Sequence, residues 1–233
     1  MRQGRTVCQS LRSVSIGTAT RSAYAHPVSN SSNATKPVAG SPPSDSDPRK
    51  TPRDGTALLI VDMVSTWDFP DGDTLLTQAV EIAANIAQLK ARCRAEGVPV
   101  IYANDNLGQW RSDFRQVVER ASAAEARGAA LTRLLAPAPD DYFVLKPKHS
   151  GFHATPLEIL LRHLQVHRLI ISGVASDQCV MSTAAEARMR EWEVLVPADC
   201  VASQTPERNR RALALFEEAL CVDTRKSTAI EWC

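Results

Sequence analysis

The sequence predicts an α/β fold with three layers (αβα), in which helices cover both faces of a doubly wound, mostly parallel sheet. From residue 56 onward, short apolar runs of strand length alternate with segments whose apolar residues recur at helical spacing. Because parallel strands are joined by crossover connections that are usually helices, this repeated strand–helix order indicates a parallel sheet. Active sites in such sheets lie at the carboxyl ends of the strands.

The first two strands flank a long helix. Residues 57–62 (ALLIVD) form a short apolar run that ends in a carboxylate, a pattern typical of a buried parallel strand. Apolar residues at helical spacing predict a helix over 75–96, and Gly97 ends that helix as a C-cap would. The second strand is predicted over 98–103, with Pro99 near its start, where a missing N–H is tolerated.

The rest of the chain repeats the alternation. Thr155 and Thr205 are expected to cap two of the helices. The Ala- and charge-rich run 119–133 is predicted to be a solvated helix, and a short sixth strand is expected near residues 221–222. The remaining predicted elements are the strands 142–146, 169–173 and 193–197 and the helices 156–164, 178–191 and 206–220.

Residues 1–54 are predicted to be a disordered extension, and residues 55–233 to be a single domain. The extension is rich in Ser and Pro and has no sustained hydrophobic period, so it cannot bury enough surface to offset the entropy of ordering. Up to Gly40 it contains arginines but no Asp or Glu, a composition found in organelle transit peptides. A solvated tail or a misplaced start codon is the simpler explanation. We therefore expect a cytoplasmic protein, with organelle targeting as the alternative in a eukaryote.

The composition argues against several classes of function. The chain has 27 Lys+Arg, 26 Asp+Glu and a formal net charge of +1, whereas proteins that bind nucleic acids through bulk charge carry a basic excess. No run approaches the roughly 20 apolar residues that a membrane span requires. The six cysteines are scattered, without a CxxC pair or a Cys/His cluster of zinc spacing. We therefore expect a reduced compartment, and no nucleic acid, membrane or metal as partner.

Three ionisable side chains fall at the predicted carboxyl ends of strands: Asp62, Lys146 and Cys179. If a helix begins at Gln178, Cys179 lies in its first turn, where the helix macrodipole and a nearby Lys146 favour a thiolate. Asp62 could take the thiol proton and later return it to a leaving group, as covalent hydrolysis requires. Taken singly, each residue also has an ordinary structural explanation, as a buried thiol, a turn-forming carboxylate or a solvated lysine.

Three segments carry a resemblance to a known family. They are residues 57–63 (ALLIVDM), residues 146–152 (KPKHSGF, a Lys followed six residues later by a Phe) and residues 173–180 (GVASDQCV). The third, Gly-Val-x-x-Asp-x-Cys-Val, is the most specific. With all three in order, the chain from about residue 55 to 225 resembles the isochorismatase-like cysteine hydrolase family. The resemblance implies that residues 55–233 form an isochorismatase-like hydrolase domain.

The resemblance implies a catalytic triad of Asp62, Lys146 and Cys179. Cys179 would be the nucleophile, Asp62 the general base and acid, and Lys146 a support for the thiolate. Lys148 is a rival for the lysine role, but the Lys-to-Phe spacing favours Lys146. The resemblance also implies a homo-oligomer that acts on a small molecule.

The family has a cis peptide bond inside the third motif, which maps to the bond between Val174 and Ala175. Such a bond would direct the N–H of Ala175, together with that of Cys179, toward a developing oxyanion. Both N–H groups would then stabilise the intermediate of acyl transfer.

Departures from the family pattern bear on the substrate. Nicotinamidases carry a metal site built from an Asp-x-His pair and a further His after the second strand, but residues 104–113 contain no His. This argues against a nicotinamidase and against any metal or other cofactor. Isochorismatases often lack the nucleophilic cysteine, so the presence of Cys179 favours hydrolysis of a C–N bond.

Loops that follow the strands supply candidate pocket residues. Trp67 and Trp110 could instead cover the end of the sheet or pack in a subunit interface. Arg111 could bind a carboxylate bidentately, although a surface ion pair is the commoner role for such an arginine. His149 lies in the same loop as Phe152 and could contact a substrate, but exposed loop histidines are common. The substrate pocket is predicted to contain Trp67, Phe69, Asn106, Trp110 and Phe152.

Three functions compete. The first is a cysteine amidohydrolase that cleaves a C–N bond of a small amide, imide or ureido compound through an acyl-enzyme. The second is hydrolysis of a vinyl ether with Asp62 as the acid. The third is a catalytically silent family member that serves as a binding scaffold.

Overall fold

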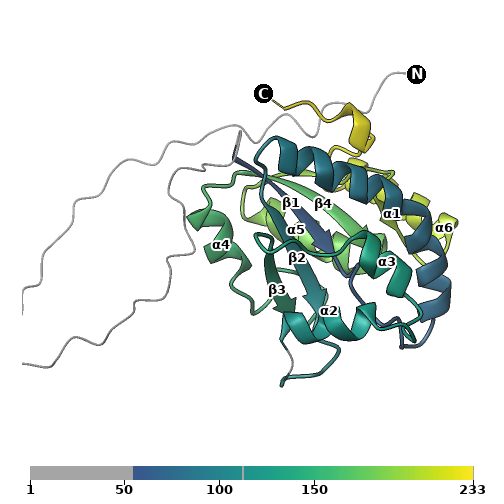
Figure 1. Cartoon of the computed structure of the whole chain (residues 1–233). Helices are drawn as coiled ribbons and strands as arrows, with labels where there is room; N and C mark the ends of the chain where they lie inside the picture. Colours follow the sequence, from purple (N-terminus) through teal and green to yellow (C-terminus); the bar gives the residue numbers. More distant parts are fainter. Residues whose placement is uncertain (1–54, 112, 233) are drawn as a thin grey trace, which may run out of the picture. The chain divides into compact units, whose positions relative to one another are not determined.

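A computed structural model describes residues 55–111 and 113–232, and the expectations for residues 1–54 lie outside the described residues. The strands form one parallel sheet in the order β3-β2-β1-β4-β5, with β6 paired to β4 (Figure 1). The strands are β1 (Thr56–Val61), β2 (Val100–Asp105), β3 (Tyr142–Lys146), β4 (Arg168–Val174), β5 (Glu193–Leu195) and β6 (Val201–Ala202). The helices are α1 (Gly72–Ala95), α2 (Phe114–Ser122), α3 (Ala129–Leu134), α4 (Leu157–His163), α5 (Met181–Met189) and α6 (Pro206–Glu218), with the π-helical turn η2 (Ser176–Val180) and the 3-10 turn η3 (Ser227–Ala229).

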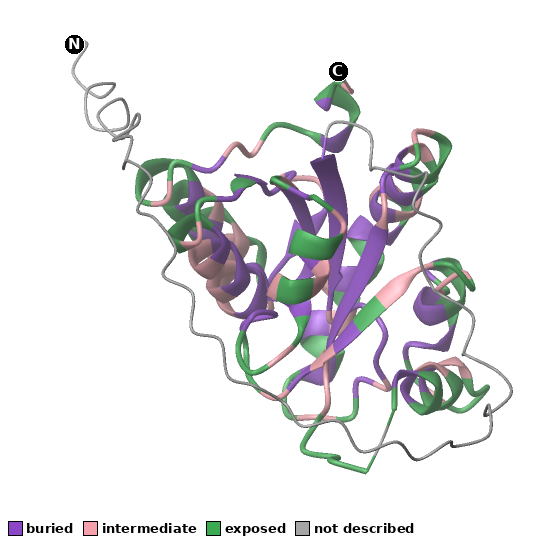
Figure 2. Ribbon diagram, turned by 90° about the vertical axis from the view of Figure 1, so that its left-hand side faces the viewer, coloured by how far each residue is buried: buried purple, intermediate pink, exposed green. Residues whose placement is uncertain are grey.

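Side chains of β1 alternate between two hydrophobic cores. Leu58 and Ile60 belong to the core that also contains the buried faces of α1, α2 and α3. Leu59 and Val61 belong to the core that contains residues of α4, α5 and α6. All six residues of β1 are buried, because helices cover both faces of the sheet (Figure 2). The predicted three-layer, doubly wound fold is therefore confirmed.

The chain reverses its winding direction between β1 and β4, the two central neighbours of the sheet. The carboxyl ends of strands at such a switch point form a crevice in which α/β proteins bind ligands. Gly173 allows these two strands to approach closely there. It has a φ of +108°, and a Cβ at this position would lie 2.0 Å from the backbone oxygen of Val61.

Two local predictions are wrong. The sixth strand is β6, at residues 201–202, whereas residues near 221–222 contribute only an isolated bridge between Leu195 and Asp223. The run 119–133 is not one solvated helix, because it is divided between the end of α2 and most of α3. Buried Ala121 and Leu131 pack these helices against the core, and the alanine-rich composition concealed that burial. Among the described residues, no helix combines the length and apolar content needed to cross a membrane.

Candidate active site

The carboxyl ends of three neighbouring strands and the turn after β4 bring Asp62, Lys146 and Cys179 together. Asp62 follows β1 directly, with a left-handed φ of 53°, and its N–H donates to the Ala103 carbonyl of β2 (3.1 Å). Lys146 is the last residue of β3, and its register partner is Asp105 at the end of β2. Cys179 lies in η2, the turn between β4 and α5. Residues more than 30 positions apart therefore meet at one edge of the sheet.

The Lys146 ammonium is the electrostatic centre of this group. Its Nζ lies 2.9 Å from Asp62 Oδ2, 3.3 Å from Asp105 Oδ2 and 3.5 Å from Cys179 Sγ. The side chain is fully buried, with 0% exposure, so its charge is held by these partners and not by water. Burial by itself would lower the pKa of Lys146, but the interactions with Asp62, Cys179 and Asp105 outweigh burial and raise that pKa. Lys146 is therefore a permanent cation.

Asp62 is largely buried, with 17% of its side chain exposed toward the cavity. One of its oxygens accepts a hydrogen bond from the Asp105 N–H (2.7 Å), and the other contacts Lys146. Burial raises the pKa of Asp62 above its ordinary value of 3.8, although Lys146 and the Cys179 thiol act in the opposite direction. A carboxyl group with a raised pKa suits proton transfer, because it can both accept a proton and return it.

The Cys179 thiol is less acidic than the sequence suggested. Burial and the negative charge of Asp62 raise the pKa of Cys179 to about 12, and the attraction of Lys146 offsets only part of this effect. The helix argument still applies, since the π-helical turn that contains Cys179 continues directly into α5, but burial and Asp62 outweigh it. Burial and Asp62 both favour the protonated thiol, so attack on a substrate requires transfer of that proton, and the neighbouring Asp62 is placed to accept it.

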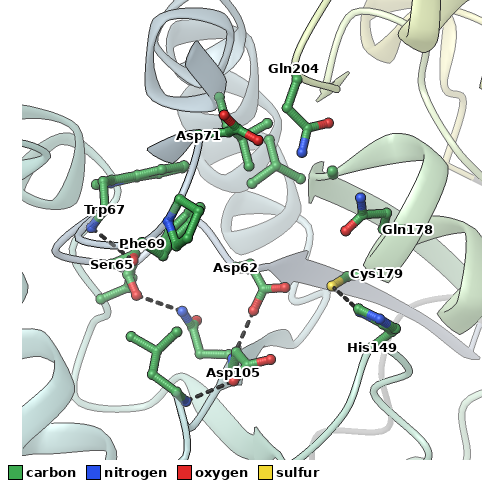
Figure 3. A pocket seen from close by; sticks show the side chains of 17 residues that line it. Asp62, Ser65, Trp67, Phe69, Asp71, Asp105, His149, Gln178, Cys179 and Gln204 are labelled. Atoms are coloured by element: carbon green, nitrogen blue, oxygen red, sulfur yellow. Dashed lines mark hydrogen bonds between the residues drawn. The ribbon is translucent and has the colours of Figure 1, made fainter. Parts of the chain in front are cut away.

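His149 is a further neighbour of the sulfur, from the loop after β3. Its Nδ1 lies 3.6 Å from Cys179 Sγ, and the ring lines the same cavity. The close-up places His149 on the side of Cys179 away from Gln204 (Figure 3). The motif spacing gave no reason to prefer His149 over His153, the other histidine of this loop. Only the folded loop directs His149 toward the sulfur.

A cavity of about 350 Å³ opens beside these groups. Asp62 and Cys179 line it, whereas Lys146 lies behind them in the protein interior. The apolar part of the wall includes Trp67, Phe69, Val64 and Leu75. Polar side chains beyond the triad come from Ser65, Asp71, Asn104, Asp105, His149, Gln178 and Gln204 (Figure 3). An apolar wall with a few converging polar groups is typical of small-molecule sites.

Two of the five predicted pocket residues line this cavity, and three do not. Trp67 and Phe69 form part of its wall and contact each other, with ring centroids 6.2 Å apart. Phe152 is buried in the core and packs on Trp192, because its loop turns the ring inward. Asn106 directs its Oδ1 to the N–H of Gly108 within its own turn. Trp110 is 79% exposed and lies outside the cavity, as does the exposed Arg111.

The bond between Val174 and Ala175 is a cis peptide, as the resemblance implied. Both residues line the cavity next to Cys179. Their position at the end of β4 places backbone groups beside the sulfur, where an oxyanion would form.

Several pocket residues were missed. Asp105 ends β2, so the same strand-end argument that found Asp62 and Lys146 could have found it. Asn104 points from the adjacent position, and its Nδ2 donates to the carbonyl of Val64 (2.6 Å). Gln204 follows β6, a strand of two residues that gives no recognisable sequence pattern.

The polar groups at the end of β2 pair with the buried lysine. Asp105 contacts the Lys146 ammonium and accepts a hydrogen bond from the N–H of Leu107 (2.7 Å). Within residues 55–111 and 113–232, no group of three or more His, Cys, Asp or Glu side chains has the arrangement of a metal site. The carboxylates of Asp62 and Asp105 thus form an ion-pair network around the Lys146 ammonium.

Comparison with known proteins places this geometry in context. A family model described as "Isochorismatase domain" matches residues 56–226. The uncharacterized isochorismatase family protein YaaI of Bacillus subtilis is 40% identical over 164 residues, which cover 70% of this chain and 90% of that protein. The ureidoacrylate amidohydrolase RutB of Methylobacterium radiotolerans is 30% identical over 209 residues, covering 73% of this chain and 81% of that protein.

Solved structures share this fold. N-carbamoylsarcosine amidase from Thermoplasma acidophilum is 25% identical, with a TM-score of 0.57 and coverage of 76% of this chain and 98% of that chain. The nicotinamidase SaPncA from Staphylococcus aureus is 26% identical, with a TM-score of 0.57 and coverage of 74% and 99%.

Proposed function

The chain belongs to the isochorismatase family of hydrolases, and on that premise we propose that it is a cysteine hydrolase that cleaves a C–N bond of a small amide, imide or ureido compound. The observation that carries the proposal is the position of Cys179. Its thiol lines the cavity, next to the Asp62 carboxylate and 3.5 Å from the Lys146 ammonium. A nucleophile, a base and a fixed cation therefore meet where a carbonyl group can enter.

The first half of the proposed reaction forms an acyl-enzyme. Asp62 takes the thiol proton while the sulfur of Cys179 attacks the substrate carbonyl carbon, so that a C–S bond forms and the oxygen becomes an oxyanion. The backbone N–H groups of Ala175 and Cys179 stabilise this oxyanion. Asp62 then gives the proton to the substrate nitrogen, the C–N bond breaks, and ammonia or an amine leaves a thioester behind.

The second half regenerates the thiol. Asp62, again a carboxylate, takes a proton from water as the water oxygen attacks the thioester carbon. The C–S bond breaks, the sulfur recovers the proton, and the carboxylic acid product leaves. Lys146 stays protonated throughout and stabilises negative charge on Asp62 or on the sulfur. His149, at 3.6 Å from the sulfur, can assist the transfer of a proton to the leaving group.

The names of similar proteins support this reaction class. Three of them are named ureidoacrylate amidohydrolase, N-carbamoylsarcosine amidase and nicotinamidase, and each name denotes hydrolysis of an amide or ureido C–N bond. The retained thiol next to a carboxylate is what such chemistry requires, whereas protonation of a vinyl ether needs only an acid.

Ether hydrolysis with Asp62 as the acid is the second candidate. One observation favours it, namely that burial raises the pKa of Asp62 and so increases its protonated fraction. This reaction does not use the sulfur of Cys179, and the two functions therefore differ in their dependence on that residue.

The test is ammonia release across a panel of small carboxamides, imides and ureido compounds, measured for wild type and Cys179→Ala. We expect wild type to act on at least one member and the variant to lose that activity by a factor of about 10³ or more. Activity that survives the substitution would refute the nucleophile assignment and support the ether hydrolase. Cys93→Ala is the matched control, because Cys93 is also a buried free thiol but lies in α1.

A further inference from the structure

The cavity has an uneven distribution of charge. Its wall contains three carboxylates, from Asp62, Asp71 and Asp105. Among the described residues, no Lys or Arg side chain lines it. The nearest cation, Lys146, is fully buried and is already engaged by Asp62 and Asp105. A bound ligand therefore faces carboxylates without an available ammonium or guanidinium group.

The remaining polar groups include an unpartnered acceptor. Asn104 is 2% exposed and uses its Nδ2 for the Val64 carbonyl, which leaves its Oδ1 without a hydrogen-bond partner among the described residues. Gln204 contacts the Ser203 hydroxyl with one end of its amide (2.9 Å), while that hydroxyl also contacts Asp177, so the other end of the uncharged amide remains for a ligand. The wall thus offers acceptors to the N–H groups of a ligand, and only uncharged donors to the oxygen atoms of a ligand.

We propose that the cavity selects amide or ureido substrates that carry no carboxylate, that is, uncharged or positively charged compounds that present N–H groups. The inference rests on the proposed function and specifies its substrate class. It differs from the compounds in the names of two relatives, because ureidoacrylate and N-carbamoylsarcosine are both anions. A carboxylate that entered this cavity would lose water without gaining a cationic partner.

Asp71 is the residue through which this selection can be measured. It is exposed, and it lies with Gln204 at the side of the cavity opposite Asp105 and His149 (Figure 3). The neighbouring acids Asp68 and Asp73 are paired with Arg127, whereas Asp71 has no cationic partner within residues 55–111 and 113–232. Clefts lined by charge of one sign focus the electric field, so this carboxylate repels an incoming anion.

Two alkylating reagents of similar size test the selection without a substrate. Iodoacetamide is uncharged and iodoacetate is an anion, and both react with the same thiolate. The ratio of their rate constants at Cys179, read by peptide mass spectrometry, is divided by the ratio for a small free thiol. We expect iodoacetamide to be favoured by an additional factor of about ten, and the factor to shrink as salt screens the charges.

Variants at Asp71 test whether its carboxylate causes the preference of Cys179 for iodoacetamide. Asp71→Asn should reduce the preference by about threefold, and Asp71→Lys should reduce it further. Glu218→Gln, which removes the same charge at the far end of α6, should leave it unchanged. An equal reactivity of Cys179 toward both reagents, or a preference for iodoacetate, would overturn the proposal.

Matched substrates separate this inference from the proposed function. Succinamide, 4-aminobutanamide and succinamate carry the same carboxamide on similar frames, with a neutral, a positive and a negative group at the other end. If ammonia is released fastest from succinamate, the charge selection is refuted while amide hydrolysis stands. If none of the three is hydrolysed but Cys179 still prefers iodoacetamide over iodoacetate, the charge selection stands. The proposed function is then decided by the panel of carboxamides, imides and ureido compounds.

Discussion

Replacing Lys146 by Met tests whether one buried ammonium holds the candidate active site together. Met keeps much of the volume of the side chain and removes its charge. The Asp62 and Asp105 carboxylates, at 2.9 and 3.3 Å from Nζ, would then lose their shared counter-ion. The thiol of Cys179, at 3.5 Å, would lose it as well. The variant should be less stable than wild type and should react poorly at Cys179.

The magnitude follows from the distances and the burial. At an effective dielectric constant of about 20, Coulomb's law gives ~6 kcal/mol for the pair with Asp62 and ~5 kcal/mol for the pair with Asp105. The cost of burying the ammonium cancels part of this attraction, because the side chain is 0% exposed. Breaking a buried ion pair by removing one partner typically costs about 3–5 kcal/mol. In a domain of this size, that loss lowers the melting temperature by roughly 10 °C.

The loss of stability in Lys146→Met should increase as the pH rises. The folded-state pKa of Asp62 is raised above 3.8, so the stability associated with its protonated form is fully present below that value. That stability is lost as the pH rises through the raised pKa. Removing Lys146 raises this pKa further, because burial is then opposed by fewer favourable interactions. The stability difference between wild type and Lys146→Met is therefore largest near pH 8 and smallest near pH 4.

Urea unfolding at both pH values, with wild type, Lys146→Met and Lys148→Met, provides the measurement. Lys148 is exposed and only two residues away, so its replacement should change the free energy of unfolding by less than about 0.5 kcal/mol. Equal stability of Lys146→Met and wild type near pH 8 would refute the electrostatic role of this lysine. So would a loss of stability that is the same at both pH values.

Three further predictions concern the residues around the sulfur and the strand crossing beneath it. Gly173→Ala should lower the free energy of unfolding in urea by more than about 1 kcal/mol, and by more than Gly97→Ala. The reason is that a Cβ at residue 173 meets the backbone of Val61, whereas a Cβ at residue 97 meets no atom. Equal losses in the two variants would contradict the close approach of β1 and β4. Asp62→Asn should lower the pKa of Cys179 from about 12, seen as faster iodoacetamide labelling near neutral pH, and an unchanged labelling profile would show that Asp62 does not hold the thiol proton. His149→Asn should slow ammonia release by about tenfold without abolishing it, and a loss as complete as that in Asp62→Asn would make the histidine the principal base.

The proximity of Asp62, Lys146 and Cys179 could be predicted because the information for it is local. Asp62 and Lys146 end apolar strands, and Cys179 lies in a short motif after another. Parallel strands put their carboxyl ends at one edge, so three local patterns are enough to predict proximity. The strand order β3-β2-β1-β4-β5, which makes them neighbours, was not predicted.

Apart from Trp67 and Phe69, which were predicted, and Asp105, which ends a strand, the pocket residues could not be predicted, because they depend on the direction of loop side chains. Phe152 follows a motif lysine, yet its ring turns into the core, while His149 in the same loop points to the sulfur. Trp110 follows β2 and still projects away from the cavity. The acidity of Cys179 was also misjudged, since the opposing effects of burial and of Asp62 depend on packing that the spacing does not show.

The most direct test of covalent catalysis by Cys179 is intact-protein and peptide mass spectrometry on rapidly quenched reactions with an amide that releases ammonia. The account predicts an adduct with the mass of the substrate acyl group on the peptide that contains Cys179, which appears with ammonia and decays to free enzyme. Steady ammonia release without any adduct, together with full activity of Cys179→Ala, would contradict it.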